Sequence, residues 1–160
     1  MSHSPQGPGP TAQGLIPRNG RVLALDWGAS RIGVAISDET QLLASPLGVL
    51  ARRAGKRLPL GDFLTLCERE HPVGLVVGLP LDDHGAEGPN AVAAREMGEQ
   101  FAARASLPIA WVDESFTTAE VLERLTDRGI APRQRRELVD AMAAAVLLER
   151  WLELRRSGRA

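Results

Sequence analysis

Residues 21–38 read RVLALDWGASRIGVAISD, two apolar and β-branched runs joined by a short turn that contains Gly28, Ser30 and Arg31. This pattern is typical of an antiparallel hairpin. Both faces of the first run are apolar, which predicts a central strand with Asp26 at its end, beside the core. A carboxylate in that place loses hydration and needs a partner such as a cation, a metal ion or several N–H donors.

The composition limits the possible classes of protein. A chain of 160 residues with 44% hydrophobic and 24% charged residues suits one globular domain. The formal net charge of −1 excludes a positive electrostatic potential over the whole molecule. Any contact with nucleic acid must therefore come from local patches of basic side chains. Cys67 is the single cysteine, which excludes an internal disulfide and a cysteine-based zinc site.

The chain carries no apolar run of membrane-spanning length and no charged-then-apolar signal at its N-terminus. The sequence therefore predicts a cytoplasmic protein without a membrane partner. Residues 1–20 are rich in Ser, Pro, Gly and Gln, and we expect a disordered tail there. The folded domain is expected over residues 21–156.

Strands and helices alternate after the opening hairpin. Residues 42–50 are a third candidate strand, in which Pro46 favours an edge position or a bulge. The pattern then predicts a helix, a buried strand, a helix, a buried strand and two helices, over residues 58–70, 73–80, 90–105, 108–114, 115–127 and 133–156. Antiparallel strands followed by strands that alternate with helices predict an α/β domain with a mixed sheet flanked by helices.

The last helix carries an acidic residue on its apolar side. At 100° per residue, Asp140 is aligned with Ala144, Leu147 and Trp151, whereas the other acids of this helix lie at the edges of the apolar arc or opposite it. An inward carboxylate here can belong to a functional site. The alternative is an acid that stabilises the first turns of the helix through the helix dipole.

A third acidic position closes the strand at residues 108–114. Glu114 shares a face with Val112, and Asp113 lies on the opposite face. The alternation alone leaves open which of the two acids faces Asp26. Strand ends in α/β sheets collect functional groups, although Asp113 could instead cap the following helix.

Three acids without a cysteine or a suitably placed histidine make an oxygen-donor site for a hard cation, Mg²⁺ or Mn²⁺. Two such ions, about 3.5–4 Å apart, could hold the attacking water and the leaving oxygen of a phosphodiester. Without metal the acids would repel phosphate. The chemistry therefore requires the acids and the cations together.

The sequence resembles the YqgF family, also called RuvX, of bacterial RNase H-like proteins. Four blocks carry the resemblance in order: Leu25–Ala35; Val76–Pro80 with Gly85–Gly88; Val112–Glu120; and Val139–Ala144. A single Asp-x-Gly turn occurs in many folds, but four blocks at suitable separations are a specific signal. The resemblance covers residues 21 to 154.

This resemblance implies an RNase H-like fold and a metal-dependent nuclease. Members of the family are described as nucleases that mature the 5′ end of the small-subunit ribosomal RNA precursor, or as Holliday junction resolvases. The positions that match the catalytic, metal-binding acids of the family are Asp26, Glu114 and Asp140. This match implies that Glu114, rather than Asp113, belongs to the site. It also implies that the cofactor is Mg²⁺ or Mn²⁺, bound as two ions.

The resemblance also implies contacts with nucleic acid. Arg31 matches an arginine of the family after the first turn, and Thr117 and Thr118 match small hydroxyl positions. Ordinary alternatives are a surface salt bridge for Arg31 and a helix start for the threonines. The basic residues shortly before Asp140 could form a phosphate-contacting rim or a solvated surface. These residues are Arg133, Arg135 and Arg136, with Arg128 before them.

Two positions depart from the pattern of the family: Ser115 stands where an arginine usually follows the catalytic Glu, and Trp27 replaces a smaller residue. The leading hypothesis is processing of pre-16S rRNA in ribosome biogenesis, with structured RNA and the small-subunit precursor as partners. Resolution of branched DNA, by a dimer, is the nearest alternative to a monomer acting on RNA. A non-catalytic ribosome-assembly factor and an ATPase of the sugar-kinase and actin type are the alternatives of other classes.

Overall fold

The structure, a computed structural model, describes residues 16–28, 30–52, 57–114 and 132–159. Five strands form one mixed sheet in the order β3-β2-β1-β4-β5. The strands β1, β2 and β3 pair antiparallel, whereas β4 and β5 run parallel to β1. Their bounds are Val22–Trp27, Arg31–Ser37, Ala44–Ala51, Gly74–Leu79 and Ile109–Asp113 for β1 to β5. The predicted α/β class with a mixed sheet is confirmed.

The hairpin and its central position are confirmed as well. In the β1–β2 register Asp26 lies opposite Gly33, and on the other side of β1 the parallel pairing places Leu25 beside Val77 of β4. Strand β3 is an edge strand, and its pairing with β2 shifts register between Val34 and Ala35. This irregularity lies opposite the Pro46 region, because proline cannot donate to a regular ladder.

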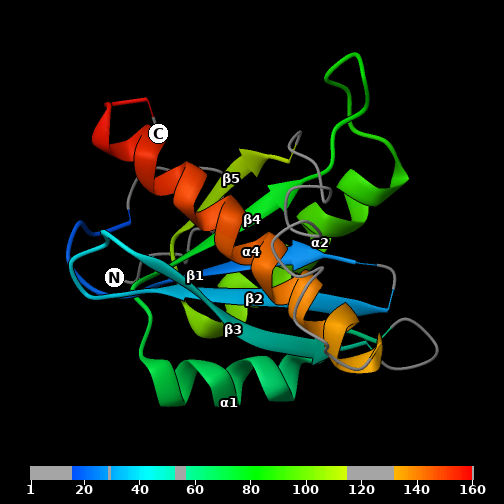
Figure 1. The fold of residues 1–160 in the computed structure, drawn as a ribbon, viewed down its shortest axis with the longest axis horizontal. Coiled ribbons are helices and arrows are strands. Elements are labelled where there is room, and N and C mark those ends of the chain that lie inside the picture. The colour runs from blue at the N-terminus through cyan, green and yellow to red at the C-terminus, as the bar shows by residue number, and fades with distance from the viewer. Residues whose placement is uncertain (1–15, 29, 53–56, 115–131, 160) are drawn as a thin grey trace, which may run out of the picture.

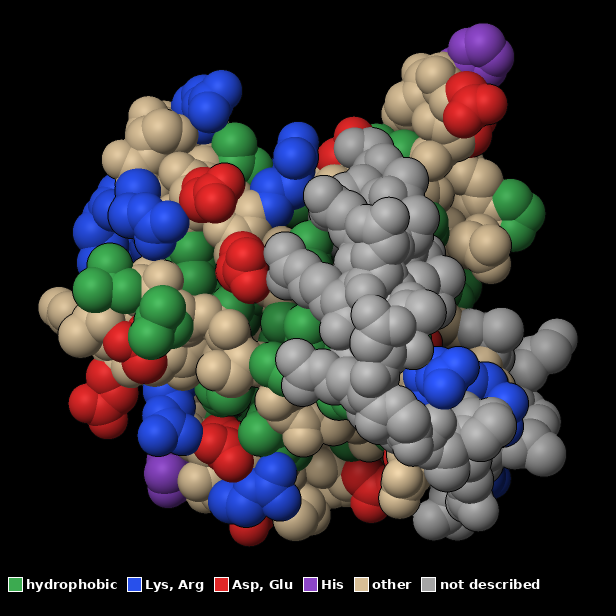
Figure 2. All heavy atoms as spheres, viewed as in Figure 1, with side chains coloured by type: hydrophobic (Ala, Val, Ile, Leu, Met, Phe, Trp, Pro, Cys, Tyr) green, Lys and Arg blue, Asp and Glu red, His purple; other side chains and the backbone are tan. Residues whose placement is uncertain are grey.

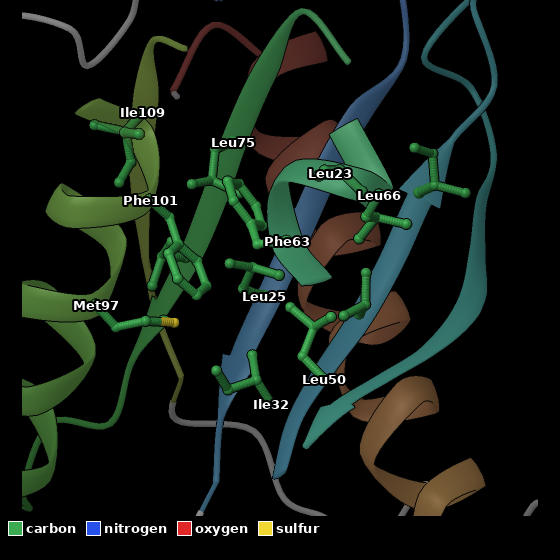
Figure 3. Packing of buried hydrophobic residues seen from close by; sticks show 14 residues of the cluster. Leu23, Leu25, Ile32, Leu50, Phe63, Leu66, Leu75, Met97, Phe101 and Ile109 are labelled. Atoms are coloured by element: carbon green, nitrogen blue, oxygen red, sulfur yellow. The ribbon is translucent and has the colours of Figure 1, made fainter. Parts of the chain in front are cut away.

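Helices α1 (Leu60–Glu70) and α2 (Pro89–Ala105) cover one face of the sheet. On this face the apolar side chains of β1 and β2 pack under two stacked rings, Phe63 of α1 and Phe101 of α2, whose centroids are 4.2 Å apart (Figure 3). This side of the sheet is filled by large apolar side chains and holds the larger part of the core.

The long helix α4 (Pro132–Arg156) runs diagonally across the other face (Figure 1). Small and β-branched side chains line this second layer, which lets the helix lie close to the strands. Among them are Val22, Ala24, Ala35, Val76, Ala110, Val112 and Ala144, and Leu147 and Leu148 of the helix pack on them. Because side chains alternate along β1, Asp26 points to this same layer, at the end of the strand.

The packed part of the chain includes residues before residue 21, where the folded domain is expected to start. Ile16 is 2% exposed and packs beside Val22 and Gly74, while the carbonyl of Pro17 accepts a hydrogen bond of 2.7 Å from Gln41. The composition of residues 1–20 does not indicate that Ile16 is buried, because one isoleucine among Gly, Pro and Gln residues does not raise the mean hydropathy of this segment. The chain thus enters the core before the hairpin begins.

Some predictions fall outside the part of the chain that the structure describes. They are the tail over residues 1–15, the helix at 115–127 and the position of Thr117. The other predicted helices correspond to α1, α2 and α4, with ends that differ by one or two residues. None of the helices within the described ranges is long and apolar enough to cross a membrane.

Candidate active site

Asp26 and Glu114 converge at the carboxyl ends of β1 and β5, on the face that α4 covers. Strand β4 lies between them in the sheet order. The backbone N–H of Glu114 donates to the carbonyl of Leu79 over 2.9 Å, which continues the parallel pairing one residue beyond β5. The side-chain carboxyl groups of Asp26 and Glu114 are joined by a hydrogen bond.

A glycine makes room for this contact. A Cβ atom on Gly78 of β4 would lie 3.3 Å from Oε2 of Glu114 and would also collide with the side chain of Leu147. The absence of a side chain therefore lets the Glu114 carboxyl pass over β4 toward Asp26. The sequence carries a signal for this contact, because a glycine inside a buried strand often marks a close approach.

Burial raises the pKa of both acids, and the hydrogen bond between them raises the pKa of Glu114 and lowers that of Asp26. The pKa of Glu114 is raised to about 10, chiefly by burial and then by its hydrogen bond with Asp26 and the charges of Asp26 and Asp113. Burial also raises the pKa of Asp26, and the negative charge of Asp140 adds to this. At neutral pH the pair therefore holds a proton, with Glu114 donating and Asp26 accepting.

Asp113, the other acid at this strand end, is exposed. It follows Trp111 on the opposite face of the sheet, where Trp111 packs against the core beneath α1 and α2. The alternation predicted that the two acids face apart, and the structure places Glu114 rather than Asp113 beside Asp26.

Asp140 reaches the same region from α4. Its backbone carbonyl lies directly over Gly33, where a Cβ atom would collide with it, and Gly33 is the register partner of Asp26. The carboxylate of Asp140 accepts a hydrogen bond from Nε of Arg31, with 2.6 Å between Nε and Oδ2. Sequence reasoning considered a salt bridge for Arg31, but it did not identify an acid of the site as the partner.

The three acids are neighbours but do not yet form a coordination shell. Within the described ranges, no three acidic, histidine or cysteine side chains are grouped closely enough to hold a metal ion as they stand. Two features explain this arrangement: a proton lies between Asp26 and Glu114, and the guanidinium of Arg31 holds Asp140. Each supplies positive charge to a carboxylate.

The turn between β1 and β2 is held by a residue that the sequence did not single out for this role. Arg52, just beyond β3, donates from its guanidinium to the carbonyl of Gly28 over 2.7 Å. Its guanidinium carbon lies 3.9 Å from the centre of the Trp27 ring, a cation–π contact. Its backbone N–H donates to the carbonyl of Ser30 over 3.0 Å. No sequence signal links residue 52 to this turn, because the link depends on the edge strand.

The remaining predicted nucleic-acid contacts lie at the start of α4. Arg135 is half-buried and Arg136 is exposed, one helical turn before Asp140. Arg133 lies in the first turn of α4 and its side chain, like the whole of Thr117, is outside the described residues. On the face shown in Figure 2, the described basic and acidic side chains are interspersed rather than gathered into one basic surface.

Comparison with known proteins identifies close relatives. The model of the RuvX family, described as Holliday junction resolvase, matches residues 20–154. A protein of Roseiflexus sp. (strain RS-1), named "Putative pre-16S rRNA nuclease", is 40% identical over 137 residues, which cover 86% of this chain and 96% of the relative. A protein of the same name from Anaeromyxobacter sp. (strain Fw109-5) is 41% identical over 134 residues, 83% of this chain and 96% of the relative.

Solved structures share the fold at low sequence identity. Thermus thermophilus RuvC in complex with a Holliday junction substrate superposes with a TM-score of 0.55 at 16% identity, covering 86% of this chain and 96% of that one. The yeast mitochondrial Holliday junction resolvase Ydc2 gives a TM-score of 0.51 at 11% identity, covering 90% and 83%. The likeness confirms the predicted RNase H-like architecture.

Proposed function

Because the chain belongs to the RuvX family, whose model matches residues 20–154, we propose that it is a metal-dependent nuclease that processes the 5′ end of pre-16S rRNA. The family and the relatives are nucleases by their descriptions. The choice of pre-16S rRNA rests on the relatives, which are similar to this chain over nearly their whole length.

The observation that carries the proposal is the proximity of Asp26, Glu114 and Asp140 at the carboxyl ends of β1 and β5. Three acids placed together at the edge of a core are costly unless positive charge neutralises them. A proton shared by Asp26 and Glu114, and the guanidinium of Arg31 beside Asp140, supply such charge. Oxygen ligands that need a compensating cation fit Mg²⁺ or Mn²⁺, and we assign Asp26, Glu114 and Asp140 as the metal ligands, for two ions.

When bound, such ions supply an activated water and stabilise the leaving oxygen of a phosphodiester. The residues of the chain have separate tasks. Asp26 and Glu114 give up their shared proton and present carboxylate oxygens. Gly33 and Gly78 keep the space over the strands clear for these acids. We assign the phosphate contacts to Arg31, Arg135 and Arg136, together with Thr117 and Arg133.

Cleavage of defined substrates tests this proposal. Purified protein is incubated with a 5′-labelled fragment of the 16S rRNA precursor, or with a labelled four-way DNA junction, in Mn²⁺ and in EDTA. We expect Mn²⁺-dependent cleavage of the RNA at the 5′ boundary of the mature sequence, lost by at least about 100-fold in Asp26→Asn. The matched control is Asp113→Asn, which removes an exposed acid next to Glu114 and should retain cleavage.

Each other outcome has a definite meaning. Preferential cleavage of the junction would overturn the choice of RNA in favour of branched DNA. Absence of cleavage of either substrate by folded protein would overturn the proposed activity and favour a non-catalytic assembly factor. Equal loss in Asp26→Asn and Asp113→Asn would contradict the assignment of the site.

A further inference from the structure

The ion pair between Arg31 and Asp140 joins two elements that are far apart in the sequence. Arg31 begins β2 and Asp140 lies in α4, 109 residues later. The side chains are 28% and 30% exposed, so the pair is partly shielded from solvent. A charge-assisted hydrogen bond in such surroundings is stronger than the same contact on an open surface. Arg31 therefore competes with any other cation for Asp140.

Only the side chain of Asp140 is free to change partner. The backbone of Asp140 packs directly against Gly33 of β2, and a Cβ atom on Gly33 would collide with the carbonyl oxygen of Asp140. Helix α4 therefore cannot shift locally without breaking this contact. The carbonyl of Asp140 lies over Gly33, the register partner of Asp26, so a rotation of the Asp140 carboxylate can turn it from Arg31 toward Asp26. The exchange thus needs no rearrangement of the fold.

Arg31 needs another anion if it is to release Asp140. Its Nε donates to Asp140, and Nη1 lies 3.5 Å from the hydroxyl of Ser30, a weak contact in the exposed turn. The planar guanidinium fits the oxygens of a phosphate well, often through two hydrogen bonds. A backbone phosphate at this turn would thus replace the carboxylate as the partner of Arg31.

We propose that Arg31 is a reversible counter-charge for Asp140, which it holds in the metal-free protein and releases to the metal when its guanidinium takes a backbone phosphate. Arg31 is in this sense a positioning residue, and the phosphodiester and the metal bind with positive cooperativity. The inference rests on the proposed function, because it needs a metal at Asp26 and Asp140.

Measurement of Mn²⁺ affinity, without any assay of activity, tests the inference. Free Mn²⁺ is followed by electron paramagnetic resonance during titration, with and without a short single-stranded RNA. The same RNA sequence with an uncharged methylphosphonate backbone is the control ligand. For the wild-type protein we expect the charged RNA to tighten Mn²⁺ binding by about fivefold or more, a typical allosteric coupling, and the uncharged one to leave it unchanged.

Three variants separate the possible causes. Without RNA, Arg31→Gln should bind Mn²⁺ about threefold or more tightly than the wild type, and added RNA should tighten it further by less than about twofold. Arg31→Lys keeps the charge and should keep the coupling in part. Arg150→Gln removes the same charge from an exposed position of α4 that lies ten residues after Asp140 and has no part in the proposed site, and it should match the wild type. Circular dichroism establishes that each variant is folded.

Weaker Mn²⁺ binding by folded Arg31→Gln would overturn the inference, because Arg31 would then support the metal ligand rather than compete with the metal. Equal tightening by Arg31→Gln and Arg150→Gln would overturn it in favour of a general charge effect. The Asp26→Asn variant distinguishes an error in the role of Arg31 from an error in the proposed function. If Asp26→Asn binds Mn²⁺ as the wild type does, both proposals fail; if it loses Mn²⁺, only the role of Arg31 is at issue.

Discussion

At the scale of single residues, the contact between the carboxyl groups of Asp26 and Glu114 links the folded state to pH. The raised pKa of Glu114, about 10 against an ordinary 4.5, means that the folded protein retains a proton that the unfolded chain has lost between these values. The stabilising contribution of this group is fully present below pH 4.5 and is lost as the pH rises toward 10. The same proton must leave when a cation binds.

The first prediction follows from this linkage. In EDTA, the free energy of unfolding of the wild-type protein should fall from pH 5 to pH 9, by on the order of 1 kcal/mol per pH unit at most for one proton. Glu114→Gln, which carries no titrating proton there, should show a shallower fall. Denaturant titrations at a series of pH values measure this, and an equally steep fall in Glu114→Gln would contradict the shared proton.

A second prediction concerns the glycine beneath Glu114. Gly78→Ala places a methyl group against Leu147 and Glu114, and we expect a loss of about 1–3 kcal/mol of stability from overpacking. Mn²⁺ binding, measured by calorimetry, should weaken because Glu114 is displaced. Gly61→Ala is the matched control: its Cβ atom meets open space in α1, so stability should be unchanged or rise by up to about 1 kcal/mol. Normal Mn²⁺ binding by Gly78→Ala would argue against this placement of Glu114.

At the scale of elements, the hairpin turn after β1 depends on the neighbouring edge strand. Arg52, which directly follows β3, stacks on Trp27 and donates to Gly28, so the turn between Asp26 and Arg31 is held from outside the hairpin. The Trp27 ring offers a surface for the guanidinium of Arg52, on the face of the sheet opposite the acids.

The third prediction tests that role by a double-mutant cycle. Arg52→Ala should cost about 1–2 kcal/mol of stability, because a hydrogen bond and a cation–π contact are lost together. Trp27→Leu removes the ring and keeps an apolar side chain. The coupling energy between the two changes, from denaturant unfolding of both single variants and the double variant, should be about 0.5–1 kcal/mol. Strict additivity would show that the stacking contributes nothing to the stability of the turn.

At the scale of the whole molecule, the sheet order brings distant acids together. Strands β1 and β5 flank β4 and run parallel to it, so their carboxyl ends lie at the same end of the sheet. Helix α4 brings Asp140 to that end. The loop between β4 and α2 leaves the same end of β4 and projects from the body of the molecule (Figure 1).

Much of this arrangement could be predicted from the sequence. Alternation along β1 places Asp26 on the same face as Val22 and Ala24, and helical periodicity places Asp140 on the apolar side of its helix, since these are local geometric rules. Alternation along β5 leaves the choice between Asp113 and Glu114 open, and the family resemblance indicates Glu114. Two contacts could not be predicted: the ion pair of Arg31 with Asp140, and the hydrogen bond from Arg52 to the carbonyl of Gly28. Both depend on how elements that are distant in the chain pack together. A glycine inside a buried strand, such as Gly78, indicates a close approach, but which groups fill the space over Gly33 and Gly78 depends on the tertiary arrangement.

The domain boundary supplies the fourth prediction. Ile16 is 2% exposed and packs within the layer beneath α4, so Ile16→Ala should cost roughly 2 to 5 kcal/mol of stability, as for other buried aliphatic side chains. Val92→Ala, at a position that is 46% exposed, is the control and should change stability little. Thermal unfolding distinguishes the two variants. A negligible effect of Ile16→Ala would return the start of the domain to residue 21.

Anomalous diffraction from crystals of the wild-type protein grown with Mn²⁺ tests most directly whether Asp26, Glu114 and Asp140 hold the metal. We predict an anomalous difference peak in contact with Asp26 and Glu114, with the Asp140 carboxylate turned toward it, and no such peak in crystals of Glu114→Gln. A manganese peak bound elsewhere, or the same peak in Glu114→Gln, would contradict the assignment of these acids as the metal site.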